Sequence, residues 1–565
     1  MSNAYLIVSV TYAGTVIRLS TADLNITDAA EGVTYSYYPG MGELTVSTAM
    51  EFLQSSAGAL SVPVSAVFPV SVAQLHAQGH QLARSPAEVA IWTEGTDYAA
   101  RIVLARGIVS DPEWGEPQEV VAFSIEDAAK TSTVTVPSGT EQVDGWTWPD
   151  SVLSLSTDDL GVPYPRVYGN PGSVSTSMAS WVAGTQLVWV SYRYNSGHLL
   201  RAVIAGHACD IKYIKLTTDE ELSAQNFATA IVQDGRGQTV TICDYFYDPP
   251  IDTYYLIGTN IAVRTTDSLG NDVYGLGDYY YGGGFHPSAD APIPTYATWY
   301  DSEDPSRGGL SPKAGDVILD MLQLAGMEVD YGRMKAAAGL LAQFRFDCVV
   351  SARVKPLEWL QAQILPLLPV SVDRSGDGAS LIVWRYDATP EDATAVLDAD
   401  ADALIERATP ISVDSADVIN RWTMNYAYSV RTGQYCEVAT RGNDTVTADG
   451  VTTLGDQDAY CIASQARYGV VEKTIESVCV YDDGTAGAIL AWMARAYAFP
   501  RRTVGYVVPS SYQLHKGQIV RLTDAKVSIT DQLAIVAELQ IDGTGTDAVR
   551  LLMIEDPQRD AKAIG

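Results

Sequence analysis

The chain has 565 residues, more than the roughly 250–300 that a single hydrophobic core serves, so we expect three or four domains. Hydrophobic residues make up 47% and charged residues 18%, a composition typical of folded globular proteins and not of disordered ones. Asp and Glu total 68 against 36 Lys and Arg, and the net charge of −32 argues against sequence-specific nucleic-acid binding.

Residues 1–130 are rich in predicted strands. The runs YLIVSVTY, GTVIRLST, ARIVLARGIVSD and QEVVAFSIED are separated by turn residues, a pattern typical of a barrel or sandwich. The chain begins without a cationic leader before its short apolar run, so we expect no signal peptide. No apolar run reaches the roughly 18 residues of a membrane-spanning helix, and we expect no stable membrane insertion.

Residues 131–305 form the second expected domain, which is also β-rich. It follows a stretch with few charges, VPSGTEQVDGWTWPDSV, that we interpret as a boundary or crossover. Its clearest strands are QLVWVSYRY, LLRAVIAGHACDIKYIKL and QTVTICDYFY. The sequence leaves open whether this stretch is one domain or two.

A loop dense in glycine, tyrosine and proline lies near the end of this region, within 277–300. Tyr279, Tyr280, Tyr281 and Phe285 stand there among glycines and are the candidate partner-contact residues. Aromatic side chains suit contact with a protein or glycan because they bring contact area with few rotamers to freeze. A loop folded back onto a neighbouring domain or subunit explains the same residues equally well.

Residues 306–400 are expected to form an α+β domain whose first helix covers 312–325. Ser311 is its predicted N-cap and Pro312 its first residue, and Gly326 is expected to end it. Its apolar residues fall on one face: Val317, Ile318, Met321, Leu322 and Ala325. We interpret this helix as a scaffold element that packs against a β-domain.

A second helix from about Pro356 and a hairpin around Asp377–Gly378 complete this α+β domain. Residues 401–565 are expected to form a C-terminal β-barrel with one helix, AGAILAWMARAYAF. The predicted fold class is therefore mainly β with minor α, a β-rich α+β multidomain chain.

Two residue clusters were weighed as metal sites. His76 and His80 have the i, i+4 spacing of ligands on a helix, but HAQGH lacks the glutamate of metalloproteases and contains a glycine. Asp398, Asp400 and Asp402 alternate like the start of a calcium loop, but the glycine and glutamate of that loop are missing. Solvated histidines and an ordinary acidic turn are the better interpretations, and no metal site is predicted.

Common catalytic motifs are also missing. The sequence has no GxSxG elbow, no GxxxxGK[ST] loop and no CxxC pair, so we nominate no catalytic or cofactor-binding residue and do not expect an enzyme. A carboxylate pair for glycoside hydrolysis stays open because the acidic residues are so numerous. The six scattered cysteines indicate reduced thiols and synthesis in the cytoplasm.

The stretch from AGDVILDMLQLAGMEVDYGRM through VKPLEWLQAQILPLLPVSVDRSGDGASLIVWRYDATPEDA resembles the central region of hub proteins from the baseplate or tail tip of long-tailed, siphovirus-like bacteriophages. VIAGHACDIKYIKL with GRGQTVTI, and the later HKGQIVRLTD, are similar to strands on either side in such hubs. The resemblance covers roughly 200–555, is most specific over 311–390, and fits 1–130 only loosely. It carries no catalytic motif.

This resemblance implies two β-barrel hub domains with the helix-containing domain between them. A homotrimer would then form a ring at the distal end of the virion tail, between the distal tail or tail-tube protein and the tip, spike or fibre proteins. The tape-measure protein would end nearby. An acidic wall would keep DNA phosphates from being trapped in the exit channel.

Two other functions stay open. The chain could be a receptor- or glycan-binding tail-tip protein whose contact surface is the aromatic loop at 277–300. A cell-wall or capsule hydrolase is the less favoured alternative.

Overall fold

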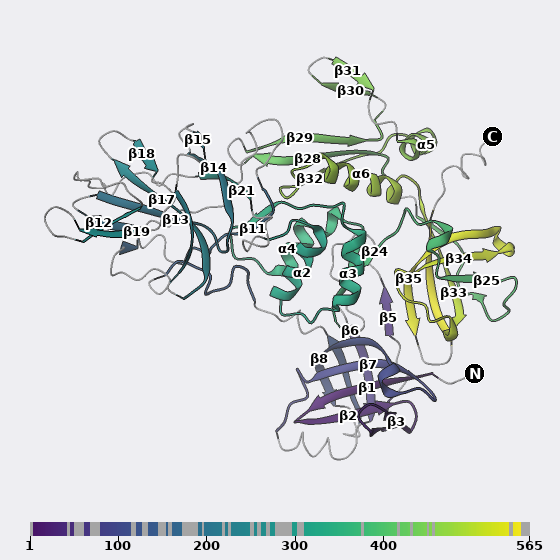
Figure 1. Ribbon diagram of the computed structural model, residues 1–565. Helices are drawn as coiled ribbons and strands as arrows, with labels where there is room; N and C mark the ends of the chain where they lie inside the picture. The colour runs from purple at the N-terminus through teal and green to yellow at the C-terminus, as the bar shows by residue number, and fades with distance from the viewer. Residues whose placement is uncertain are drawn as a thin grey trace.

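A computed structural model describes the chain as a β-rich multidomain fold with few helices (Figure 1). No helix of the described residues is long and apolar enough to cross a membrane. The described residues are 4–41, 46–49, 61–67, 79–114, 120–126, 134–144, 154–155, 161–171, 190–194, 197–216, 221–223, 228–234, 236–248, 253–256, 262–266, 272–276, 296–301, 310–373, 378–414, 418–429, 433–443, 445–448, 451–454, 458–541 and 546–554.

The N-terminal region is a barrel whose six-stranded sheet has the order β2-β1-β7-β8-β9-β6. Because successive side chains of a strand point to opposite faces, Leu6, Val8 and Val10 enter the inner core, while Ile7 packs with Ile26 in a second cluster outside it. The hairpin β3–β4 covers this outer face. The elements are β1 (Ala4–Tyr12), β2 (Thr15–Ser20), β3 (Leu24–Asp28), β4 (Val33–Tyr37), β6 (Ser61–Val67), β7 (Pro86–Thr93), β8 (Ile102–Trp114) and β9 (Val120–Glu126).

The segment 38–41 closes this barrel by joining the two edges of the sheet. On one side the Tyr38 amide donates to the Arg18 carbonyl of β2 at 2.9 Å, and on the other the Val67 amide of β6 donates to the Gly40 carbonyl at 2.6 Å. A Cβ on Gly40 would lie 2.1 Å from the Val67 carbonyl oxygen, so this close approach requires glycine.

The second region consists of antiparallel sheets of six, three and two strands, which Figure 1 shows on the opposite side of the helices from the C-terminal sheet. Its elements are β10 (Ser154–Leu155), β12 (Val190–Tyr194), β13 (Gly197–Ala205), β14 (Asp210–Leu216), β15 (Glu221–Ser223), β16 (Ala228–Gln233), β17 (Thr239–Asp248), β18 (Thr253–Leu256), β19 (Ala262–Thr266), β20 (Asp272–Leu276) and β21 (Tyr296–Asp301).

A helical layer occupies the centre of the molecule and shares one buried cluster with a three-stranded sheet of order β29-β28-β32. Helix α6 lies directly against that sheet (Figure 1). The elements are α2 (Ala314–Leu324), α3 (Tyr331–Leu340), α4 (Pro356–Gln363), α5 (Ala459–Tyr468), α6 (Asp483–Tyr497), the pair β11 (Arg166–Tyr168) and β22 (Cys348–Val350), the hairpin β23 (Val370–Asp373) and β24 (Ser380–Val383), β28 (Arg421–Ser429), β29 (Gln434–Arg441), β32 (Glu472–Glu476), and the hairpin β30 (Thr445–Ala448) and β31 (Val451–Leu454).

The first predicted helix is α2, with two corrections. It begins at Ala314 with Lys313 as N-cap, so the prediction of Ser311 as N-cap and Pro312 as first residue was wrong by two positions. Helix α2 packs against α3 and α4, not against a β-domain alone. The apolar face is buried as expected: Val317, Ile318, Met321 and Leu322 are each 0% exposed. The left-handed Gly326 (φ +77°) follows the helix as predicted.

The C-terminal sheet has the order β25-β34-β35-β36-β33-β26, and β27 also pairs with β33. A strand from the N-terminal region, β5 (Val46–Ala49), pairs antiparallel with the end of β35, and one buried cluster includes residues of both β-rich domains. The two domains are thus joined by main-chain hydrogen bonds and by apolar packing. The strands are β25 (Ala395–Asp398), β26 (Glu406–Arg407), β27 (Ser412–Asp414), β33 (Arg501–Pro509), β34 (Ile519–Asp524), β35 (Ile529–Ile541) and β36 (Thr546–Met553).

The buried clusters group the last third of the chain in two parts. Residues 418–498 pack with the helical layer, whereas 395–414 and 501–554 build the C-terminal sheet. The predicted four-domain division, with a boundary at 400, stays a prediction.

Candidate functional site

The candidate contact residues Tyr279, Tyr280, Tyr281 and Phe285 lie outside the described residues, so their role stays a prediction. His76 lies outside them as well. The described His80 has a structural role: its main-chain carbonyl accepts a hydrogen bond from the Tyr12 hydroxyl at 2.9 Å, and the two rings meet edge to face.

The acidic turn after β25 is held by its own carboxylates. Asp398 accepts from the amides of Asp400 and of Ala401 at 3.0 and 3.1 Å, and Asp402 accepts from the Tyr512 hydroxyl at 3.0 Å. Within the part of the chain that the structure describes, no group of three or more His, Cys, Asp or Glu residues could hold a metal ion.

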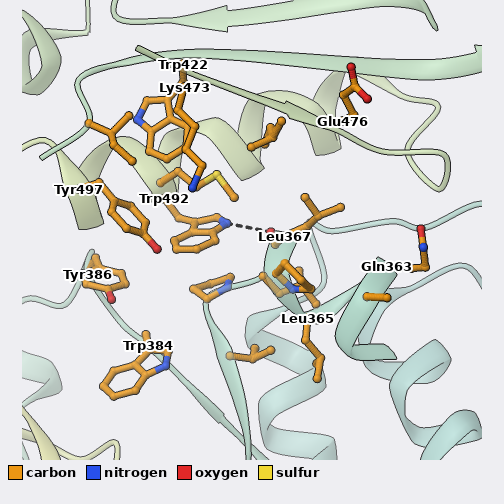
Figure 2. Close-up of a pocket in the computed structure, with 18 residues that line it drawn as sticks. Gln363, Leu365, Leu367, Trp384, Tyr386, Trp422, Lys473, Glu476, Trp492 and Tyr497 are labelled. Carbon is orange, nitrogen blue, oxygen red and sulfur yellow. Dashed lines mark hydrogen bonds between the residues drawn. The ribbon is translucent and has the colours of Figure 1, made fainter. Parts of the chain in front are cut away.

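An aromatic cavity of about 530 Å³ lies between α6, β28, β32 and the chain on both sides of the hairpin β23–β24. Figure 2 shows Trp492 at its centre, with Trp422 and Lys473 above it and Tyr386 and Trp384 below. Five of its lining residues are large aromatic residues from three separate parts of the chain: Trp384, Tyr386, Trp422, Trp492 and Tyr497.

The rings of this aromatic cavity hold one another in place. Tyr386 stacks on Trp492 with ring centroids 6.4 Å apart and planes 17° apart, and Trp422 meets Tyr497 edge to face at 5.5 Å. The Trp492 indole donates to the Leu367 carbonyl at 3.0 Å, which fixes the central ring (Figure 2). The cavity is therefore preformed and does not need a ligand to assemble it.

The polarity of the cavity suits binding more than catalysis. Burial raises the pKa of the Tyr386 hydroxyl well above its usual value, so this hydroxyl stays neutral at physiological pH. Within the described part of the chain, the buried indole N–H of Trp422 has no hydrogen-bond partner. Charge enters at the upper wall through Lys473 of β32, while the carboxylate of Glu476, at the edge of the cavity, points away from Trp492 (Figure 2). Such a cavity accommodates bulky apolar groups beside a polar rim.

Sequence reasoning missed this site. Its tryptophans lie at 384, 422 and 492, too far apart for a spacing rule, and each belongs to a string that reads as core strand or helix. The stretch 384–497 is no richer in aromatic residues than the whole chain, so composition gave no signal for the site either.

A second cavity, of about 740 Å³, lies where the N-terminal barrel, α3 and the C-terminal sheet meet. The buried Asp373 carboxylate binds Arg333 of α3 and lies 3.9 Å from the Nζ of Lys516, which belongs to the C-terminal domain. Burial lowers the pKa of Lys516, and the Asp373 charge opposes that shift. This ion cluster ties the helical layer to the C-terminal domain.

No protein-family model and no curated protein sequence matches the chain. Among solved structures it is similar to a tail protein from Neisseria meningitidis MC58 (TM-score 0.34, 9% identity, covering 98% of this chain and 97% of that one). A prophage tail protein from Listeria monocytogenes EGD-e has a TM-score of 0.31 and 7% identity, with coverage of 96% and 97%. The 43 kDa tail protein of prophage MuSo2 from Shewanella oneidensis has a TM-score of 0.32 and 10% identity, with coverage of 98% and 99%.

Proposed function

We propose that the chain is a structural protein of a bacteriophage tail, and specifically the hub of its tip or baseplate. The resemblance of 311–390 to hub proteins carries this proposal, together with the architecture. Two β-rich domains flank a helical layer, and β5 of the first domain completes the free half of β35 in the second. Such coupling suits a rigid ring subunit because the two domains cannot move independently without breaking main-chain hydrogen bonds.

In this proposal three copies form a closed ring in which each chain contributes two β-domains, giving a pseudo-sixfold face toward the distal tail or tail-tube protein. Tip, spike or fibre proteins attach on the other face, and the tape-measure protein ends nearby. The ring surrounds the DNA exit channel, where the net charge of −32 disfavours phosphate binding. The chain is made and assembled in the host cytoplasm, and its role is structural, not enzymatic.

Absolute mass from light scattering, with negative-stain images of the same sample, tests this proposal. A ring of three times 60.7 kDa is the expected result. The hub role would be contradicted if the chain is a monomer at high concentration and stays a monomer when it is co-expressed with its tail partners.

A further inference from the structure

The edge of the three-stranded sheet above the aromatic cavity carries an inference that goes beyond the proposed tail role and does not depend on it. Strand β32 is the last strand of the order β29-β28-β32, and no described strand pairs with its other side. We propose that β32 is a strand-addition site for an extended segment of another protein. That segment has bulky apolar side chains toward the cavity and basic side chains on the opposite face.

The hydrogen bonds of β32 show which of its main-chain groups are open. The Arg421 amide donates to the Val471 carbonyl at 3.1 Å, and the Ser477 amide donates to the Asn425 carbonyl at 3.0 Å. In a parallel ladder the groups of alternate residues point to the same side, so odd-numbered residues of β32 face β28. The N–H and C=O groups of Glu472, Thr474 and Glu476 therefore point away from the sheet.

The side chains beside this edge lead into the cavity. Lys473 is in register with Trp422, and Ile475 with Met424, so both lie on the face that carries the core and both line the cavity. Side chains of an added strand that stand opposite Lys473 and Ile475 would point the same way. They would enter the aromatic cavity, whose volume of about 530 Å³ is ample for two large apolar side chains.

Exposed apolar residues extend the surface at both ends of β32. Val470, Val471 and Val478 are 50%, 38% and 40% exposed, within nine residues of chain. An open strand edge next to exposed apolar side chains is a surface that proteins usually cover.

The charges on β32 favour another protein over a second copy of this chain as the source of the added strand. On β28, Arg421 pairs with Glu472 at 2.6 Å, and the Asn425 side-chain amide donates to Glu476 at 3.3 Å. In a symmetric antiparallel pair of β32 strands, Glu472 of one copy would stand opposite Glu476 of the other, and the like charges would be only partly offset by Arg421. The net charge of −32 adds repulsion between copies. A strand with Lys or Arg opposite both glutamates is complementary instead.

The test uses the full-length chain and the labelled synthetic peptide Gly-Lys-Phe-Thr-Phe-Lys-Gly, whose alternation fits either strand direction. Fluorescence anisotropy should show saturable binding, and the tryptophan emission of the cavity should change in parallel. The matching peptide with Ser in place of both Phe should not bind. The absence of saturable binding up to about 1 mM, or equal binding of the Ser peptide, would overturn the proposal.

A matched pair of variants isolates the strand edge. Thr474→Pro removes an outward N–H and no bond to β28, and proline is tolerated on edge strands. We expect this variant to lose affinity by about tenfold, whereas Thr474→Val keeps the N–H and binds like the unchanged protein. Unaltered hydrogen exchange in β28 verifies that the sheet is intact. Equal affinity of the two variants would show that the main chain does not bind the peptide.

Charge reversal tests the chemistry of the partner. The double variant Glu472→Lys with Glu476→Lys should no longer bind the Lys peptide. It should instead bind the peptide that has Glu in place of both Lys residues. Peptide preference that does not follow the charges would overturn the assignment of a basic partner. The unchanged chain could also associate with itself, and Thr474→Pro could abolish that association. This result would identify a second copy of the chain as the partner and would overturn the assignment of a basic partner.

Discussion

The contact between α2 and α3 gives a sharp test of the packing in the helical layer. Gly315 lies in the first turn of α2, and a Cβ there would meet the Cβ of Ala338 in α3 at 2.4 Å and its Cα at 2.9 Å. Gly339, next along α3, has nothing within 4 Å of its own added Cβ. Changing each glycine to alanine adds the same methyl group near a helix end. The methyl group at Gly315 meets Ala338, whereas the methyl group at Gly339 enters open space.

The expected effects have opposite signs. Gly315→Ala forces the helices apart by about 1 Å, and overpacking of this kind costs about 1–3 kcal/mol. The better helix propensity of alanine offsets up to about 1 kcal/mol of that, which leaves a net loss of about 1–2 kcal/mol. Gly339→Ala has no clash and should stabilise the helix by about 0.5–1 kcal/mol.

Hydrogen exchange is the suitable assay because a multidomain chain does not unfold in one transition. The amides of Met321 and Leu322, in the buried half of α2, should exchange about 5–30-fold faster in Gly315→Ala than in the unchanged chain. In Gly339→Ala they should exchange no faster than in the unchanged chain. Equal exchange in both variants would refute the close packing of α2 on α3.

Three further predictions concern charge. Asp373→Asn leaves Lys516 buried without its counter-ion and should cost about 2–3 kcal/mol, less than a fully buried pair because Arg333 is partly exposed. The α3 amides should therefore exchange faster with solvent than in the unchanged chain, and unchanged exchange would contradict the prediction. Burial lowers the pKa of His207 from 6.5 to about 4, and its neutral Nε2 accepts a hydrogen bond from the Val167 amide at 3.0 Å. The contribution of His207 to the stability of the fold is therefore complete above pH 6.5 and is lost as the pH falls toward 4. The stability difference between the unchanged chain and His207→Gln should therefore shrink over that range, and a constant difference would refute it. Duplex DNA should bind weakly and with little dependence on salt; tight binding that falls steeply with salt would contradict an acidic channel wall.

Local patterns predicted part of the helical layer: α2, α4 and α6. The apolar stripe at Val317, Ile318, Met321 and Leu322 is fully buried, because a 3.6-residue period allows only one face to meet the core. The hairpin β23–β24 and the long helix α6 also lie where the sequence placed them. Helices α3 and α5 were missed, although Asp330 and Asp458 cap them by accepting from first-turn amides, and the expectation of one helix in 401–565 was wrong because α5 and α6 both lie there.

The features that depend on distant parts of the chain were not predictable. The pairing of β5 with β35 joins residues almost 500 positions apart, and nothing in a four-residue strand specifies its partner. The aromatic cavity likewise requires α6, β28 and the chain on both sides of the hairpin β23–β24 to meet. A single sequence carries no record of which of its aromatic residues converge.

The central claim, that this chain is a structural component of a phage tail, is tested most directly by immunogold electron microscopy. The particles come from the bacterium that carries the gene, and the antibody is raised against the purified chain. Gold at one end of the tail, remote from the head, is the result the account predicts. Gold on the head, or chain found only free of particles, would contradict it.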